Sequence, residues 1–197
     1  DALAPRLGVA TDHVQPGYED AWYYLWKERR FATNVDPLAS KLASEEDRAR
    51  LAHIFEQGLD RVIGYVLPLR TSTSEESGPR WISGRWFLRA GHLFLVPGDS
   101  PIGLRLPLDS LPWSAPEDLH VVEEPDPFAP RQPFIRSAVA REPQGFAPRA
   151  SPQQPPRRGD SARGIVRTAL CIEPRHGRLH IFMPPVTRAE DYLDLIA

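Results

Sequence analysis

The sequence predicts an α+β fold, in which an antiparallel sheet built from two β-hairpins, at about residues 81–96 and 165–183, packs with helices near 45–58 and 188–197. Two pairs of short apolar segments, each pair joined by a turn that contains glycine, indicate the hairpins. Two amphipathic segments can cover the sheet. A third observation is that 14 of the 22 prolines lie between Pro97 and Pro156, which predicts a Pro-rich irregular insert.

The helix near 45–58 is predicted from its start and from its periodicity. Ser44 is a favourable N-cap, and the acidic residues that follow it suit the first turn of a helix. Apolar side chains then recur at helical spacing, at Leu51, Ile54, Phe55 and Leu59. The segment at 188–197 shows the start of a similar amphipathic pattern.

The strands are predicted from short β-rich segments. Residues 61–69 form one such segment, which Pro68 should end or confine to an edge. Residues 81–88 and 92–96 flank Arg89-Ala90-Gly91, where Gly91 suits a positive φ. Residues 165–173 and 178–183 flank the turn Pro174-Arg175-His176-Gly177 in the same way. We expect both hairpins in one antiparallel sheet.

Composition narrows the class of protein. The net charge is −2, so no overall field favours nucleic acid or an anionic membrane. The single cysteine, Cys171, excludes an internal disulfide and a cysteine-rich zinc site, which favours a reducing compartment. No apolar stretch is long enough to span a membrane, and no secretory signal opens the chain. We therefore expect a cytoplasmic protein that binds neither nucleic acid nor membrane.

The chain is expected to contain one domain and one insert. Residues 1–124 and 165–197 form the predicted α+β domain, and residues 125–164 form a mobile Pro/Arg-rich insert. The insert carries seven arginines against three acids; a basic phosphate-binding arm is the alternative to a solvated linker. Because the chain begins with Asp1 and its last amphipathic pattern stops early, we expect an excerpt from a larger protein.

Motifs for known chemistry are largely missing. The chain has no P-loop, no GxGxxG, no HExxH and no GxSxG. Ser100 follows Gly-Asp as in some esterases, but the spacing of Asp118 and His120 does not fit a catalytic triad. Cys171 could form a Cys–His nucleophile pair with His176 or His180, but it lies in an apolar stretch, so we interpret it as a buried, unreactive thiol. No histidine spacing indicates a metal site.

Two charged residues and an aromatic cluster are the first candidates for a site. Glu173, near the end of a predicted strand, could hold a metal or an ammonium group, although an ion pair with Arg178 across the turn would explain it without a ligand. Arg167 could contact a phosphate. The cluster around Trp22, Tyr23 and Trp26 could stack on a ligand or a partner, although packing in a core or between domains is the alternative.

Several stretches are familiar when they are taken together. They are 18–30, 34–38, 64–69, 85–101 and 166–185, and the most specific is the block LRLPLDSLPW at 104–113. Together they resemble the putative amidoligase region of large bacterial transglutaminase-like proteins, and the resemblance covers most of the chain outside the insert.

The resemblance implies a function for the parent protein. A transglutaminase-like domain would precede this region and the rest of the ligase region would follow it. The ligase would resemble glutamine-synthetase-like carboxylate–amine ligases, which use ATP and magnesium. This chain alone would lack the complete site, with Arg105, Arg167 and Glu173 as candidates for contact with it. From a different class, a non-catalytic module that binds a peptide or partner for the transglutaminase-like domain is the alternative.

Overall fold

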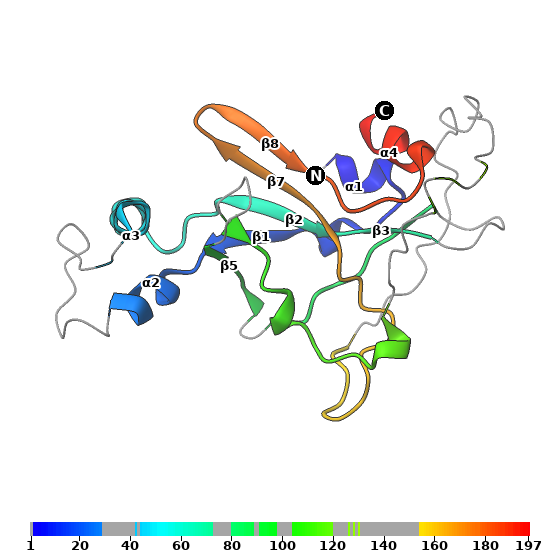
Figure 1. Ribbon diagram of the computed structural model, residues 1–197, viewed down its shortest axis with the longest axis horizontal. Coiled ribbons are helices and arrows are strands. Elements are labelled where there is room, and N and C mark those ends of the chain that lie inside the picture. The colour runs from blue at the N-terminus through cyan, green and yellow to red at the C-terminus, as the bar shows by residue number, and fades with distance from the viewer. Residues whose placement is uncertain are drawn as a thin grey trace. The chain divides into compact units, whose positions relative to one another are not determined.

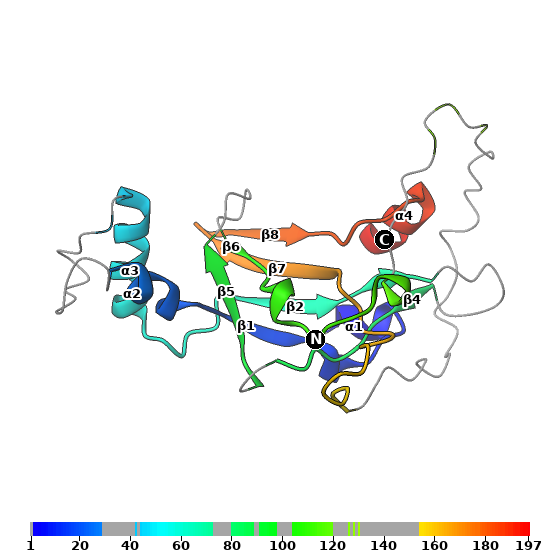
Figure 2. The ribbon, with the colours of Figure 1, turned by 60° about the horizontal axis from the view of Figure 1, so that its bottom comes forward.

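The structure is a computed structural model, shown in Figure 1 and, turned, in Figure 2. It describes residues 2–28, 42, 44–72, 80–88, 91–97, 104–119, 126, 128, 130 and 154–197. Of residues 25–28 and 97 only the backbone is described.

A mixed six-stranded sheet has the strand order β6-β5-β1-β2-β7-β8. Its strands are β1 (Gln15–Glu19), β2 (Gly64–Pro68), β5 (Leu93–Pro97), β6 (Leu104–Arg105), β7 (Ala169–Arg175) and β8 (Arg178–Phe182). Strand β5 runs parallel to β1 and antiparallel to β6, and β7 runs antiparallel to β8. A separate two-stranded sheet pairs β3 (Arg70–Thr71) with β4 (Trp81–Ile82).

The α+β class and the second hairpin are confirmed, whereas the first hairpin is wrong. Residues 81–88 and 92–96 do not form its two arms, because β4 pairs with β3 and β5 pairs with β1 and β6. The sheet is therefore mixed and not purely antiparallel. Strand β1 was not predicted from the sequence, because the Pro16-Gly17 pair within it is typical of a turn. In the structure Gly17 allows close packing, since a Cβ there would lie 3.3 Å from Leu95 Cδ1.

Four α-helices accompany the strands in the described residues: α1 (Leu3–Arg6), α2 (Ala21–Glu28), α3 (Glu45–Gln57) and α4 (Ala189–Ile196). The helices predicted near 45–58 and 188–197 are α3 and α4, so both predictions are confirmed. The Ser44 hydroxyl accepts a hydrogen bond from the Asp47 N–H at 3.4 Å, as expected of an N-cap. The chain leaves α3 at Gly58, whose φ of +90° favours glycine. Short 3-10 turns lie at Thr11–His13, Leu108–Ser110 and Pro116–Asp118.

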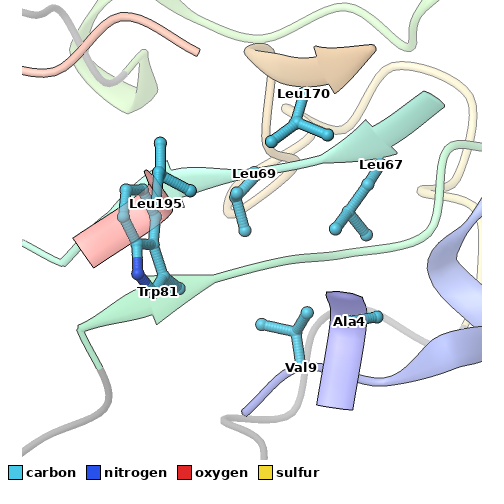
Figure 3. Close-up of a cluster of buried hydrophobic side chains, with 7 residues drawn as sticks. All are labelled: Ala4, Val9, Leu67, Leu69, Trp81, Leu170 and Leu195. Atoms are coloured by element: carbon cyan, nitrogen blue, oxygen red, sulfur yellow. The ribbon is translucent and has the colours of Figure 1, made fainter. Parts of the chain in front are cut away.

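The chain divides into two compact units, each with its own apolar cluster. The first comprises Asp1–Gln15, Val66–Phe87 and Leu111–Ala197, and the second comprises Pro16–Tyr65 and Leu88–Ser110. Figure 3 shows the cluster of the first unit, where side chains from helices and strands meet. Its members are Ala4, Val9, Leu67, Leu69, Trp81, Leu170 and Leu195.

Polar contacts fix α4 beside this first cluster. Arg80 Nε lies 3.2 Å from Asp191 Oδ1, and Arg80 Nη1 lies 3.1 Å from Asp194 Oδ1. The indole N–H of Trp81 donates to Asp194 Oδ2 at 2.6 Å. The side chain of Asp191 is buried, so its pairing with Arg80 matters for the stability of the first unit.

In the second unit, helix α3 packs against α2, as Figure 2 shows. Leu51 and Ile54 of α3 are buried there with Tyr24 of α2. Phe55 and Leu59, which the periodicity placed on the same face, are 45% and 56% exposed. The helix therefore buries a narrower stripe than the sequence indicates.

Most of the predicted mobile insert, 125–164, lies outside the described residues, but its end is described. The Ala162 N–H donates to the Trp113 carbonyl at 2.8 Å, and the Ser161 hydroxyl accepts from the Ala115 N–H at 2.8 Å. Arg163 pairs with Asp118 at 3.0 Å. Residues 161–163 are thus tied to the segment 113–118.

Candidate anion-binding site

The β7–β8 hairpin presents basic side chains on one face of its tip. In the register, Arg175 lies directly across from Arg178, and Glu173 lies directly across from His180. Because side chains alternate along a strand and directly paired residues share a face, these four lie on the same face. Arg175, Arg178 and His180, together with His176 of the turn, line an open pocket of about 490 Å³. The tip of this hairpin is therefore a candidate site for an anion.

The turn that joins the two strands has two central residues, His176 and Gly177, with φ of +51° and +72°. Two positive φ values fit a type I′ turn, the short connection that matches the twist of paired strands. Glycine adopts this conformation freely, but histidine does so at a cost. A histidine kept in a strained position beside two arginines is consistent with a role in binding.

The arrangement of charges favours an anionic ligand. Like charges directly opposite on a hairpin destabilise it, and Arg175 and Arg178 are such a pair. An anion between them would relieve the repulsion and accept charge-assisted hydrogen bonds from the guanidinium groups. Glu173 is the one carboxylate that the register places on this face of the paired segment, so it offsets only part of the positive charge.

The register corrects one prediction about Glu173. Glu173 was expected to face Arg178 directly across the turn, but Arg178 is opposite Arg175 and Glu173 is opposite His180. The reason is that the turn has two central residues and not four, which moves the pairing by two positions. The role of Glu173 as a ligand-binding carboxylate and its ion pair with Arg178 as the alternative both stay predictions.

The other two charged candidates lie apart from the hairpin tip along the chain. The Arg167 guanidinium donates from Nη2 to the Pro112 carbonyl and, at 2.8 Å, to the Ser114 hydroxyl, while its Nε is buried without a hydrogen-bond partner among the described residues. These bonds give Arg167 a structural role in holding the 112–114 segment. Arg105 is exposed on β6, directly across from Val96. Phosphate contacts by either arginine stay predictions.

The aromatic candidates have different environments. Trp22 is 76% exposed, whereas Tyr23 is partly buried and packs edge-on against the buried Tyr24, with ring centroids 5.5 Å apart. The side chain of Trp26 lies outside the described residues. Among these three aromatic residues, Trp22 is the one whose described side chain is exposed to a partner. Ser100, the esterase candidate, lies outside the described residues.

One arrangement resembles a nucleophile paired with its base but is buried. His13 Nδ1 lies 3.0 Å from the Ser83 hydroxyl, but the residues are only 7% and 5% exposed. Burial lowers the pKa of His13, against the opposing effect of Asp12. Since no substrate could reach this pair, we interpret it as a hydrogen-bonded core contact.

Cys171, the other candidate nucleophile, is only partly buried, and its chemistry is testable. Burial, reinforced by the Glu173 carboxylate, raises the pKa of the Cys171 thiol from 9.0 to about 11. At pH 8 the thiolate fraction should be about a hundredfold lower than for an ordinary thiol. We expect iodoacetamide to alkylate Cys171 slowly at pH 8, and rapidly once urea unfolds the chain. A native rate that reaches half its maximum near pH 8.5 would contradict this expectation.

No group of three potential metal ligands occurs among the described residues. The basic pocket of the hairpin, in contrast, has the donors that phosphate requires.

No helix in the described part is long and apolar enough to cross a membrane.

Sequence reasoning missed the pocket residues Arg175, His176, Arg178 and His180, although a signal was present. Four basic side chains lie within six residues around a glycine turn, but they were interpreted as turn residues, as a partner for Glu173 and as histidines that could pair with Cys171. The density of cations on both sides of a short turn, which brings them onto one face, could have indicated the site.

The fold and the basic hairpin define an α+β domain with a candidate anion site. Comparison with protein families gives a match over residues 1–197 to the family described as "Putative amidoligase enzyme (DUF2126)". The chain therefore belongs to this family. No curated protein and no solved structure matches the chain.

Proposed function

We propose that this chain is a segment of an ATP-dependent carboxylate–amine ligase and that the β7–β8 hairpin binds an anionic group of its substrates. In such ligases ATP activates a carboxylate as an acyl phosphate, and an amine then displaces the phosphate to form an amide. The observation that carries the proposal is the pocket lined by Arg175, His176, Arg178 and His180, in a chain of the amidoligase family.

Within this proposal the hairpin orients charge. The two guanidinium groups would hold phosphate or carboxylate oxygens by charge-assisted hydrogen bonds, and the rigid two-residue turn would keep them in place. The proposal includes a cytoplasmic parent with a transglutaminase-like domain before this segment and the rest of the ligase after it. Residues beyond this chain would complete the site, so the chain alone would not turn over ATP.

Replacing Arg178 with alanine should weaken binding of pyrophosphate to the chain by roughly 10- to 100-fold, because a hydrogen bond to a charged group contributes about 1.5–3 kcal/mol. Isothermal titration calorimetry with pyrophosphate measures this change. Arg163→Ala is the matched control, since it removes the same charge from an exposed arginine that pairs with Asp118. Equal affinities of the two variants would overturn the hairpin as the anion site.

Activity requires the full-length protein. It should hydrolyse ATP only when a carboxylate and an amine are both present, and Arg178→Ala should lower that turnover while Arg163→Ala does not. Glu173→Ala should lower it without unfolding the protein. ATP turnover by the 197-residue chain alone would contradict the proposal that its site is incomplete.

The second candidate is a module that binds a partner or peptide for the transglutaminase-like domain, and the exposed Trp22 favours it. Under this function Trp22→Ala would abolish association with that domain and leave ATP turnover by the full-length protein unchanged. Under the ligase function alone, the association would not depend on Trp22.

A further inference from the structure

We propose that the outer edge of β8 binds an extended peptide in which acidic and apolar residues alternate, by adding the peptide to the sheet as a further strand. The inference rests on the proposed function for the peptide's role, because it names a polypeptide as the substrate that carries the carboxylate. Three features of the hairpin carry it: the position of β8, the direction of its backbone groups, and the two kinds of side chain on its faces.

Strand β8 (Arg178–Phe182) is the last strand in the order of the six-stranded sheet. It pairs with β7 on one side, and no described strand pairs with its other side. Figures 1 and 2 both show β8 as the outer strand of its hairpin. An outer strand offers a row of backbone donors and acceptors to a partner strand.

The register indicates which backbone groups face outward. In a hairpin with a two-residue turn, the pair that closes the turn, here Arg175 and Arg178, exchanges backbone hydrogen bonds, and hydrogen-bonded pairs then alternate along the ladder. Arg178, His180 and Phe182 therefore direct their backbone groups toward β7. Leu179 and Ile181 direct their N–H and C=O groups to the outer edge.

The side chains of β8 alternate in chemistry as well as in direction. Leu179 and Ile181 lie on one face and are 63% and 50% exposed. Arg178 and His180 lie on the opposite face, beside Arg175 and Glu173, so this basic face carries two arginines against one carboxylate. Because side chains of an added strand alternate in step with β8, every second peptide residue would meet the apolar face and the others would meet the basic face.

Charge selects the peptide over a second copy of this chain. Acidic side chains of the peptide would complement the arginines on the basic face. Two copies joined through their β8 edges would instead bring two basic faces onto one continuous face, where like charges repel. An acidic peptide therefore fits the edge better than self-association does.

The test uses the 197-residue chain and three blocked, fluorescently labelled hexapeptides, EVEVEV, KVKVKV and EEEVVV. Fluorescence anisotropy should show that EVEVEV binds at least tenfold more tightly than the other two. EEEVVV has the same composition and charge, so equal binding of EEEVVV and EVEVEV would overturn the alternating fit. Equal binding of KVKVKV would overturn the role of the arginines.

Leu179→Pro tests the backbone contact. Proline removes the outward N–H of residue 179 and leaves the β7–β8 ladder intact, so the variant should bind EVEVEV at least tenfold more weakly. Leu179→Ala is the matched control, since it shortens the same side chain but keeps the N–H. Its affinity for EVEVEV should fall less than that of Leu179→Pro. Wild-type affinity in Leu179→Pro would overturn strand addition.

Two further measurements keep the test decisive. If Leu179→Pro does not fold, EVEVEV methylated at alternate backbone nitrogens replaces it: methylation in one of the two alternating sets should abolish binding, and equal effects of both sets would overturn the proposal. If the chain forms a dimer that Leu179→Pro abolishes, the edge binds a second copy of the chain instead.

Binding of pyrophosphate separates this inference from the proposed function. Pyrophosphate binding without EVEVEV binding overturns the peptide site alone, whereas EVEVEV binding without pyrophosphate binding overturns the proposed anion pocket alone.

Discussion

Replacing Arg80 with alanine should lower the free energy of unfolding by about 3 kcal/mol at neutral pH, because it leaves a buried carboxylate without its cation. Arg80 contacts Asp191 at 3.2 Å and Asp194 at 3.1 Å, and only 8% of the Asp191 side chain is exposed. The Arg80 side chain is 29% exposed, which places the expected cost at the lower end of the range for buried pairs. Urea denaturation measures the change.

The buried carboxylate also gives the effect a pH dependence. Burial raises the pKa of Asp191, and Arg80 opposes this shift. An acid whose pKa is raised on folding contributes stability that is fully present below its unfolded pKa and lost as the pH rises through the folded value. Removing Arg80 raises the pKa of Asp191 further. The difference in the free energy of unfolding between Arg80→Ala and the unchanged protein should therefore shrink as the pH falls from 7.5 toward 4.5.

Two variants separate this cause from general damage. Asp191→Asn in the Arg80→Ala background removes the uncompensated charge, so it should restore at least half of the lost stability. Arg188→Ala deletes another arginine at the start of α4, one that is 60% exposed and 3.9 Å from Glu190, and should cost under about 0.5 kcal/mol. If Asp191→Asn restores nothing, the cost comes from lost packing and the charge argument fails.

Elements defined by local signals were predictable from the sequence. Helix α3 has its N-cap Ser44 and a glycine at its end, and the β7–β8 hairpin has its glycine turn, so each is encoded within a short stretch. The pairing of β1 with β5 was not predictable, because these strands are more than 70 residues apart and β1 contains Pro16-Gly17. Long-range partners depend on tertiary contacts that no local pattern contains.

The candidate site was predictable only in part, for a related reason. The sequence directed attention to Glu173 and the hairpin that holds it, but the partner of each side chain depends on the length of the turn. The sequence predicted a turn of four residues, which placed Arg178 opposite Glu173. The turn has two central residues, so Arg178 is instead opposite Arg175, and this pair of arginines was not predicted. A shift of two residues keeps every side chain on its face and changes which charges are neighbours.

Replacing Tyr24 with alanine should lower the free energy of unfolding of the second unit by about 3–5 kcal/mol, the usual cost of deleting a buried aromatic ring. Tyr24 has no exposed surface and packs with Leu51 and Ile54. Its hydroxyl donates to Glu19 Oε1 at 3.2 Å, so the side chain joins β1 to helices α2 and α3. Urea denaturation and hydrogen exchange measure the loss.

Tyr24→Phe separates the ring from the hydroxyl and should cost about 1.5–3 kcal/mol, because it loses the hydrogen bonds of the hydroxyl with the charged side chains of Glu19 and Arg50 and keeps the packing. Burial, reinforced by Glu19, raises the pKa of Tyr24 well above its ordinary value of 10.0. The stability from the neutral phenol is therefore fully present below pH 10 and lost as the pH rises beyond it, and the phenylalanine variant should lack this part of the alkaline loss. Equal alkaline sensitivity would exclude Tyr24 as its source.

Tyr24→Ala and Arg80→Ala also test whether the two apolar clusters unfold separately. Tyr24 belongs to the cluster of Ala21, Leu42, Leu51 and Ile54, and Trp81, next to Arg80, belongs to the other cluster. Tyr24→Ala should therefore accelerate amide exchange in α3 more than in β7 and β8, and Arg80→Ala should do the reverse. Equal acceleration everywhere would show that both clusters unfold in one cooperative step, and each substitution would then measure the stability of the whole chain.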